Sequence, residues 1–173
     1  MAQAGNDLSG MYSEALERMA KNGDPRAQTA LADEHYAGLG RPQDFGEAAK
    51  WYHRAAEQGF AKAQNLLGEM YKLGQGVRQD FQEGAKWYRM AAEQGEPMAQ
   101  LALGIMYAQG RGLPRNFVQA YMWIALAELS LPSATWQALQ RNWDPLSELE
   151  KEMSAAEVAQ GRKLAREWKP KIK

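Results

Sequence analysis

Apolar and polar positions repeat along most of this chain with a period of 36 residues. Three blocks follow one another without a gap, at residues 27–62, 63–98 and 99–134. The first two blocks are identical at 18 of 36 positions, and the second and third at 11. Unrelated sequences would agree at about one position in twenty, and a period in the mid-thirties is typical of helix–turn–helix repeats. The pattern therefore predicts a repeat protein.

Each block predicts two helices separated by a glycine turn. Over residues 27–37, the apolar residues Ala27, Ala30 and Leu31 and then His35, a tyrosine in the other two blocks, stand at i, i+3, i+4 and i+8, which places them on one face of a helix. Gly38 and Gly40 are expected to end this helix, because glycine adopts positive φ without strain. A second helix is expected to begin after Asp44, a good N-cap residue, and to end at Gly59. No segment alternates with period 2, so we expect no β-sheet.

Two repeated positions point to packing. Ala32, Gly68 and Gly104 share a place in the first helix, where glycine costs about 1 kcal/mol relative to alanine. We expect close contact with a neighbouring helix to compensate for that cost. A second position carries a tryptophan in every block: Trp51, Trp87 and Trp123. We interpret these rings as filling the space between helix layers.

The middle block carries the most complete version of a longer motif. Its residues are Ala63, Leu67, Gly68, Tyr71, Gly74, Gly76, Val77, Asp80, Trp87, Tyr88, Ala91, Ala92, Glu93, Gln94 and Gly95. This motif resembles the Sel-one-like repeat, a relative of the tetratricopeptide repeat. The resemblance covers about residues 8–130, with 8–26 similar to the second helix of a degenerate leading repeat. It implies an all-α, right-handed α/α-solenoid of helix–turn–helix repeats.

Beyond residue 130 the repeat is lost but helix signals continue. Asp144 precedes a proline, and Ser154 with Glu157 forms a capping-box pattern. Because solenoid ends require caps, we interpret residues 131–168 as a C-terminal helical cap and 169–173 as a frayed tail. The prediction is one domain over 1–173 with about nine helices, in which the repeats occupy 27–62, 63–98 and 99–130. The basic run from Arg162 either stays solvated or meets an acidic surface.

Composition and charge exclude several functions. Lysine plus arginine and aspartate plus glutamate both total 21, so no basic excess indicates nucleic-acid binding. No apolar run approaches the ~20 residues of a membrane helix, so no membrane insertion is expected. Cysteine is absent, and the two histidines, His35 and His53, lack metal-site spacing. With no nucleophile elbow or phosphate loop either, we expect no catalytic residues, no metal, no cofactor and no enzymatic activity.

The sequence constrains the cellular compartment and the oligomeric state less than it constrains the fold. The first residues lack the features of a secretory signal, which predicts a soluble, cytoplasmic chain as given. A trimmed N-terminus would instead fit a periplasmic or secreted protein, and absent cysteine fits either setting. We expect a monomer.

The resemblance also implies where a partner binds, because in this family the first helix of each unit lines the concave face. The non-repeated polar positions of those helices are Thr29, Asp33, Tyr36, Asn65, Glu69 and Lys72. In the third block the same positions are apolar: Leu101, Ile105 and Ala108. We expect the C-terminal cap to cover the apolar part, which leaves the polar part for a peptide or protein partner. The repeated glutamines Gln28, Gln64 and Gln100 either offer amides to a ligand or bond between helix layers.

The function that the resemblance implies is a non-enzymatic protein–protein interaction scaffold or adaptor. Family members commonly act in bacterial envelope, secretion, signalling or toxin-immunity complexes. The alternative is an enzyme or small-ligand-binding protein that acts on envelope material at the junction of solenoid and cap. A cluster of buried polar residues at that junction would favour the alternative, and a dry junction would favour the scaffold.

Overall fold

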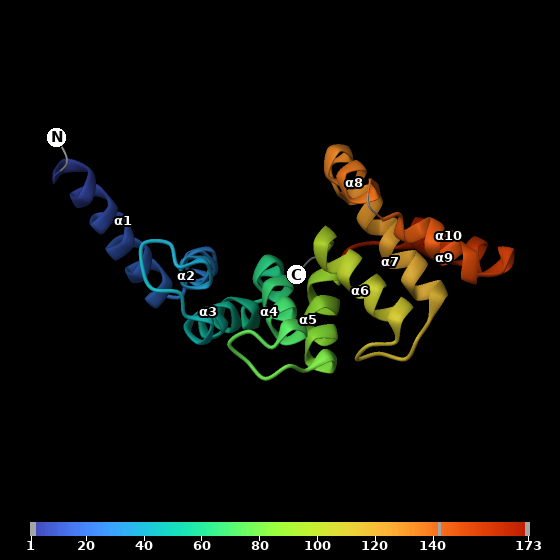
Figure 1. Cartoon of the computed structure of the whole chain (residues 1–173), viewed down its shortest axis with the longest axis horizontal. Coiled ribbons are helices and arrows are strands. Elements are labelled where there is room, and N and C mark those ends of the chain that lie inside the picture. Colours follow the sequence, from blue (N-terminus) through green and yellow to red (C-terminus); the bar gives the residue numbers. More distant parts are fainter. Residues whose placement is uncertain (1–2, 142, 172–173) are drawn as a thin grey trace. The chain divides into compact units, whose positions relative to one another are not determined.

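The computed structural model describes residues 3–141 and 143–171, with side chains from Met11 onward except that of Tyr12. This part of the chain forms ten helices and no strand, one helix more than expected (Figure 1). They are α1 (Gln3–Lys21), α2 (Pro25–Ala37), α3 (Phe45–Glu57), α4 (Ala61–Leu73), α5 (Phe81–Glu93), α6 (Pro97–Gln109), α7 (Phe117–Ser130), α8 (Ser133–Gln140), α9 (Pro145–Glu152) and α10 (Ala155–Glu167).

The chain divides into two compact units, Met1–Gln79 with α1 to α4 and Asp80–Lys173 with α5 to α10. A single domain over the whole chain stays a prediction. In the first unit α1 ends at Lys21 and is followed by Gly23 at φ 96°, as α3 is followed by Gly59 at φ 86°. The leading helix therefore ends in the same kind of turn as the second helix of a repeat.

The predicted helix boundaries rest on the expected capping residues. The carboxylate of Asp44 accepts the backbone N–H of Glu47 at 2.9 Å and so begins α3. Gly38 ends α2 in the left-handed conformation at φ 70°. Gly76, in the next repeat's turn, is at φ 68°, and a Cβ there would lie 1.9 Å from the carbonyl oxygen of Phe45. Both backbone conformation and space therefore require glycine at this place.

The repeated glutamines bond between helices. Their Nε2 atoms donate to the carbonyl oxygen eight residues earlier, in the last turn of the preceding helix, and all three side chains are buried. The pairs are Gln28 with Ala20 at 3.1 Å, Gln64 with Ala56 at 3.0 Å, and Gln100 with Ala92 at 3.3 Å. Of the two interpretations left open by the sequence, the structure supports the bond between layers.

Close contact between α6 and α7 explains a glycine inside a helix. A Cβ at Gly104 would lie 2.6 Å from Cγ1 of Ile124 and 3.0 Å from the carbonyl oxygen of Ala120. Real Cβ atoms do not come within 3.0 Å of such neighbours. The expected compensation for the glycine is confirmed at this position.

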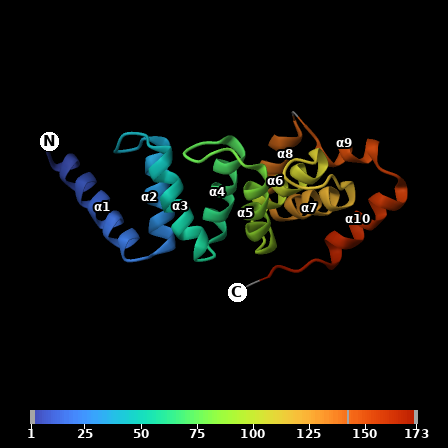
Figure 2. The same ribbon diagram turned by 90° about the horizontal axis from the view of Figure 1, so that it is seen from below.

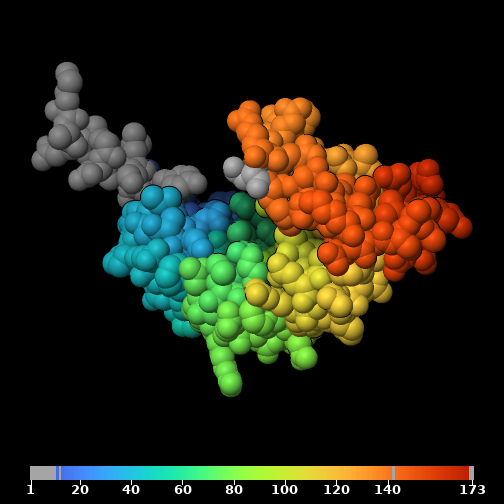
Figure 3. Space-filling view, turned by 45° about the vertical axis from the view of Figure 1, so that its right-hand side comes forward, coloured from blue at the N-terminus to red at the C-terminus, as the bar shows by residue number. Residues whose placement is uncertain are grey.

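The C-terminal cap, α8 to α10, covers the apolar part of the repeats, as expected. Leu101 is buried in one cluster with Trp136 of α8 and Leu149 of α9, and Ile105 and Ala108 pack against that cluster. Figure 3 shows the cap in orange and red against α6 and α7 in yellow. α8 begins 36 residues after α6, so it keeps the register of the repeat although the repeat motif is lost.

The chain after α10 runs back to α5 (Figure 2). Trp168 packs edge-to-face against Trp123, with ring centroids 6.0 Å apart. The backbone N–H of Lys171 donates to the carbonyl of Glu93 at 2.7 Å, and its ammonium lies 3.0 Å from the Glu93 carboxylate. Residues 169–171 are thus held by contacts, unlike the frayed end expected. Ile172 and Lys173 lie outside the described residues.

Candidate binding groove of the first unit

A hollow of about 310 Å³ lies between α2, α3 and α4 of the first unit. We call it the first-unit groove. Its lining is mostly apolar: Asp33, Tyr36, Ala37, Leu39, Tyr52, Leu66, Glu69 and Met70. Three of the six predicted contact residues, Asp33, Tyr36 and Glu69, therefore lie around one hollow. They come from the first helices of two consecutive repeats, which follow one another in Figure 2.

Asp33 is held in place by a buried tyrosine. The hydroxyl of Tyr52, a residue only 2% exposed, donates to Oδ1 of Asp33 at 2.5 Å. Burial, together with the Asp33 carboxylate, raises the pKa of Tyr52, so the phenol stays protonated and remains a donor. The other carboxylate oxygen lies 3.3 Å from the Lys62 ammonium, and 43% of the Asp33 side chain is exposed. The carboxylate is thus oriented by the fold yet accessible to a partner.

Glu69 forms an exposed ion pair with a lysine of its own helix. Its carboxylate lies 2.7 Å from the Lys72 ammonium, three residues further along α4, and both side chains are more than a third exposed. Exposed ion pairs of this kind contribute about 0.2–1 kcal/mol. A cation from a partner can therefore compete with Lys72 for this carboxylate.

Tyr36 adds a fixed aromatic wall. Its hydroxyl donates to Oε1 of Gln75 at 2.9 Å, and its ring packs edge-to-face against Phe45 with centroids 5.2 Å apart. Contacts on two sides remove most of the ring's freedom. A partner that packs on Tyr36 therefore loses little side-chain entropy.

The other predicted contact residues lie outside the lining. Thr29 is only 2% exposed and its hydroxyl donates to the carbonyl of Pro25 at 2.7 Å, so no partner can reach it. Asn65 is half-buried and does not line the groove, and Lys72 takes part only through Glu69. Sequence reasoning missed Leu39, which lines the groove and is 65% exposed. The signal in the sequence that could have indicated it is an apolar residue between the two turn glycines, Gly38 and Gly40.

The junction between repeats and cap has an apolar interior and a polar edge. At that edge the hydroxyl of Tyr121 donates to Oε1 of Glu150 at 2.9 Å and accepts Nε–H of Arg162 at 2.9 Å. Burial raises the pKa of Tyr121, which keeps this hydroxyl protonated. Tyr121 is buried, whereas Glu150 and Arg162 are exposed and bond to each other at 2.9 Å. The polar groups at this edge are thus paired among themselves.

Within the described residues no three or more histidine, aspartate or glutamate side chains are grouped to hold a metal ion. His35 lies 3.4 Å from Arg41 through Nε2, and His53 lies 3.3 Å from the Glu57 carboxylate through Nδ1. None of the helices in the described ranges combines the length and the apolar character needed to cross a bilayer.

The comparisons with known proteins agree with this architecture. The family model of the Sel1 repeat matches residues 25–60, 61–96 and 97–128, which is the predicted period with each repeat starting two residues earlier. No curated protein sequence matches the chain.

Two solved structures illustrate the likeness. A Sel1 repeat protein from Oxalobacter formigenes is 33% identical over 79% of this chain, with a TM-score of 0.67. A protective antigen of uropathogenic Escherichia coli strains, which displays an SLR fold, is 28% identical over 88% of this chain, also with a TM-score of 0.67. This chain spans 58% and 37% of those two proteins.

The expected fold class, an all-α solenoid of Sel-one-like repeats, is confirmed by these matches and by the ten helices of the described residues. Proteins built from these repeats generally serve as scaffolds that bind other proteins. The three matched repeats cover more than half of the sequence, and the chain belongs to the Sel1 repeat family.

Proposed function

We propose that this protein is a non-enzymatic interaction scaffold or adaptor that binds a peptide or protein partner in the first-unit groove. The observation that carries the proposal is the combination of an apolar hollow with two accessible carboxylates, Asp33 and Glu69, at equivalent positions of consecutive repeats. The groove fits an apolar side chain of the partner, with a lysine or arginine beside it. Tyr36 supplies a rigid contact surface.

The energetics indicate what such a groove can supply. Burial of one leucine- or phenylalanine-sized side chain contributes about 1.5–3 kcal/mol. A micromolar complex requires about 8 kcal/mol. Burial of this one side chain is therefore insufficient for a micromolar complex, and the partner must also contact the helix surfaces around the groove. The two carboxylates add orientation and faster association more than raw affinity.

The family resemblance supports a bacterial envelope, secretion or toxin-immunity complex as the setting, and we propose that the chain binds its partner as a monomer. Neither point rests on a contact within the groove. Both are part of the proposal and are tested by identifying the partner and its stoichiometry.

The experiment begins with a random peptide library displayed on phage and selected against the immobilised full chain. Selected peptides are expected to share an apolar residue next to lysine or arginine. Calorimetric titration then compares the wild type with the double variant Asp33→Lys, Glu69→Lys at two salt concentrations. We expect at least tenfold weaker binding, equivalent to about 1.4 kcal/mol, and a smaller dependence on salt.

Two controls separate binding from folding. Gln82→Lys with Gln119→Lys introduces the same residue type at second-helix positions outside the groove and should leave affinity unchanged. Because Asp33→Lys also removes the bond from Tyr52, Glu69→Lys alone is measured as a variant that keeps that bond. Unchanged affinity in a folded double variant would rule out this groove as the principal site.

A further inference from the structure

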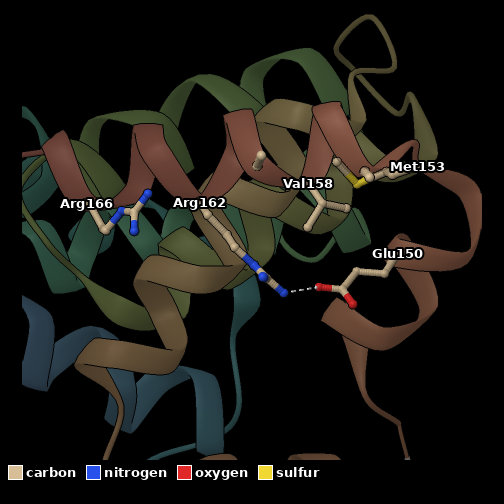
Figure 4. A pocket seen from close by; sticks show the side chains of 7 residues that line it. Glu150, Met153, Val158, Arg162 and Arg166 are labelled. Atoms are coloured by element: carbon tan, nitrogen blue, oxygen red, sulfur yellow. Dashed lines mark hydrogen bonds and ion pairs between the residues drawn. The ribbon is translucent and has the colours of Figure 1, made fainter.

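The second unit has a separate hollow on its C-terminal cap, with a volume of about 600 Å³ (Figure 4). We call it the cap hollow. Residues of α9, α10 and the turn between them line it: Glu150, Met153, Ala155, Val158, Ala159, Arg162 and Arg166. It shares no residue with the first-unit groove.

Arg162 forms a fixed wall of the cap hollow. Its Nε–H donates to the Tyr121 hydroxyl and its Nη2 to Glu150, both at 2.9 Å, and Figure 4 shows it extended toward that carboxylate. The helix can lie this close to Tyr121 because Gly161 has no side chain. A Cβ at Gly161 would lie 2.9 Å from the tyrosine ring. Glu150 thus both orients Arg162 and compensates its charge.

Arg166 lies one helical turn further along the same side of α10 and is exposed. Among the described residues it forms no ion pair, whereas Lys163 on the same helix lies 3.9 Å from Glu167. The cap hollow therefore carries one guanidinium whose charge is not compensated. Arginine can bind a carboxylate through two parallel hydrogen bonds.

The remaining lining is apolar. Met153 and Val158 project beside Arg162 in Figure 4, and Ala155 and Ala159 contribute small exposed side chains. A small inorganic anion gains nothing from this part of the surface. A peptide with an apolar side chain next to a carboxylate uses both the apolar lining and Arg166.

We propose that the cap hollow is a second binding site, which takes an acidic peptide segment of a partner protein. An apolar side chain of the segment packs on Met153 and Val158, and a neighbouring aspartate or glutamate pairs with Arg166. The charge preference is opposite to that of the first-unit groove. The scaffold can therefore distinguish two kinds of segment.

The test uses fluorescein-labelled heptapeptides and the full chain, with binding followed by fluorescence anisotropy. The reference peptide has a central leucine flanked by glutamates. Two related peptides change one feature each, glutamine for every glutamate or serine for the leucine. We expect each change to weaken binding at least tenfold. If the glutamine peptide binds more weakly but the serine peptide binds as the reference does, the hollow binds anions without using the apolar residue. That result would overturn the proposal.

Matched protein variants locate the site. Arg166→Glu should weaken binding of the reference peptide at least tenfold. Lys163→Glu makes the same charge change on the same helix outside the hollow and should have little effect. Ala159→Glu places a carboxylate in the hollow at an exposed position and should also reduce binding. Equal losses in Arg166→Glu and Lys163→Glu would show long-range attraction without a site.

Two further measurements exclude other outcomes. In the first, inorganic phosphate and single-stranded DNA compete with the labelled peptide. If either displaces it at a lower concentration than the unlabelled peptide does, the hollow binds phosphate groups and the proposal is overturned. The double variant Asp33→Lys, Glu69→Lys should bind the acidic peptide as the wild type does. Failure of the first-unit groove and failure of the cap hollow are thus distinguishable.

Discussion

Replacement of Gly104 by alanine sets two opposing effects against each other within α6. Alanine inside a helix is favoured over glycine by about 1 kcal/mol, so propensity alone predicts a more stable protein. The new Cβ, however, would lie 2.6 Å from Cγ1 of Ile124, 3.0 Å from the carbonyl oxygen of Ala120 and 3.2 Å from the backbone nitrogen of Ile124. Two of these three neighbours are backbone atoms, which cannot rotate away as a flexible side chain would.

The sizes of the two effects decide whether Gly104→Ala raises or lowers the free energy of unfolding. An extra carbon forced into a closely packed site typically costs about 1–3 kcal/mol, and contact below 3.0 Å with backbone nearby indicates the upper half of that range. After subtracting about 1 kcal/mol for the gain in propensity, we expect a net loss of about 1–2 kcal/mol.

The assay is urea unfolding of the wild type and Gly104→Ala, followed by circular dichroism at 222 nm and by tryptophan fluorescence. A lower midpoint with an unchanged slope would show a change in stability rather than in the unfolded state. The first repeat supplies a reciprocal control, because Ala32 occupies the equivalent position and is fully buried. Ala32→Gly should also destabilise, by about 1 kcal/mol or more, since it loses both propensity and a buried methyl group.

The outcome that would refute this reasoning is a Gly104→Ala protein more stable than the wild type. It would mean that α6 and α7 separate at no cost, and that close approach does not explain the glycine. A destabilised Gly104→Ala together with a stabilised Ala32→Gly would instead show that glycine is preferred at this place in every repeat.

Three further predictions concern stability. Trp87→Ala removes a side chain that is only 7% exposed and should lower the free energy of unfolding by about 3–5 kcal/mol, measured by urea unfolding. Tyr52→Phe should cost about 1–2 kcal/mol near pH 7, through the lost bond to Asp33. Because the pKa of Tyr52 is raised in the folded state, only the unfolded wild type releases this proton as the pH rises above 10, so the stability difference between the two proteins should shrink there. Trp168→Ala should lower the free energy of unfolding by about 1 kcal/mol or more, and should speed hydrogen exchange at the Lys171 amide, which would lose its protected position beside Glu93.

Much of the fold was predictable because the repeat places the same local signals at the same spacing. Asp44 marks the start of a helix through its side-chain acceptor, and Gly38 marks an end through its left-handed backbone. These are interactions between near neighbours, which a sequence displays directly. The second glycine of the turn is different. Its contact with the preceding repeat, as between Gly76 and Phe45, becomes visible only in three dimensions.

The site was partly predictable for a related reason. Asp33 and Glu69 are 36 residues apart in a 36-residue repeat, so their shared location follows from the period. Thr29 shows the limit of this argument, because its hydroxyl is satisfied by the carbonyl of Pro25 four residues earlier and the residue is buried. A threonine can pair its own donor locally, so a polar residue at a non-repeated position is not necessarily exposed.

The cap hollow could not be derived from the sequence. Arg162 meets Tyr121 from 41 positions away, across the junction of repeats and cap, where no period relates the two residues. Their contact depends on the close approach of α10 to α7, which the absence of a side chain at Gly161 allows. Sequence reasoning identified only a basic run from Arg162, with an acidic surface as one of two interpretations.

The buried glutamine bonds have a consequence for how the number of repeats can change. Each amide donates to a backbone carbonyl of the preceding helix, and a backbone carbonyl is present whatever residue stands there. A duplicated or deleted block of 36 residues therefore leaves no glutamine amide without its acceptor.

This freedom ends at α8. The position 36 residues after Gln100 holds Trp136, a buried ring within the apolar cluster that the cap forms with α6 and α7. An array of these repeats can thus lengthen or shorten by duplication or deletion of 36-residue blocks before the cap, whereas the segment that carries Trp136 has no glutamine at the position that forms this bond.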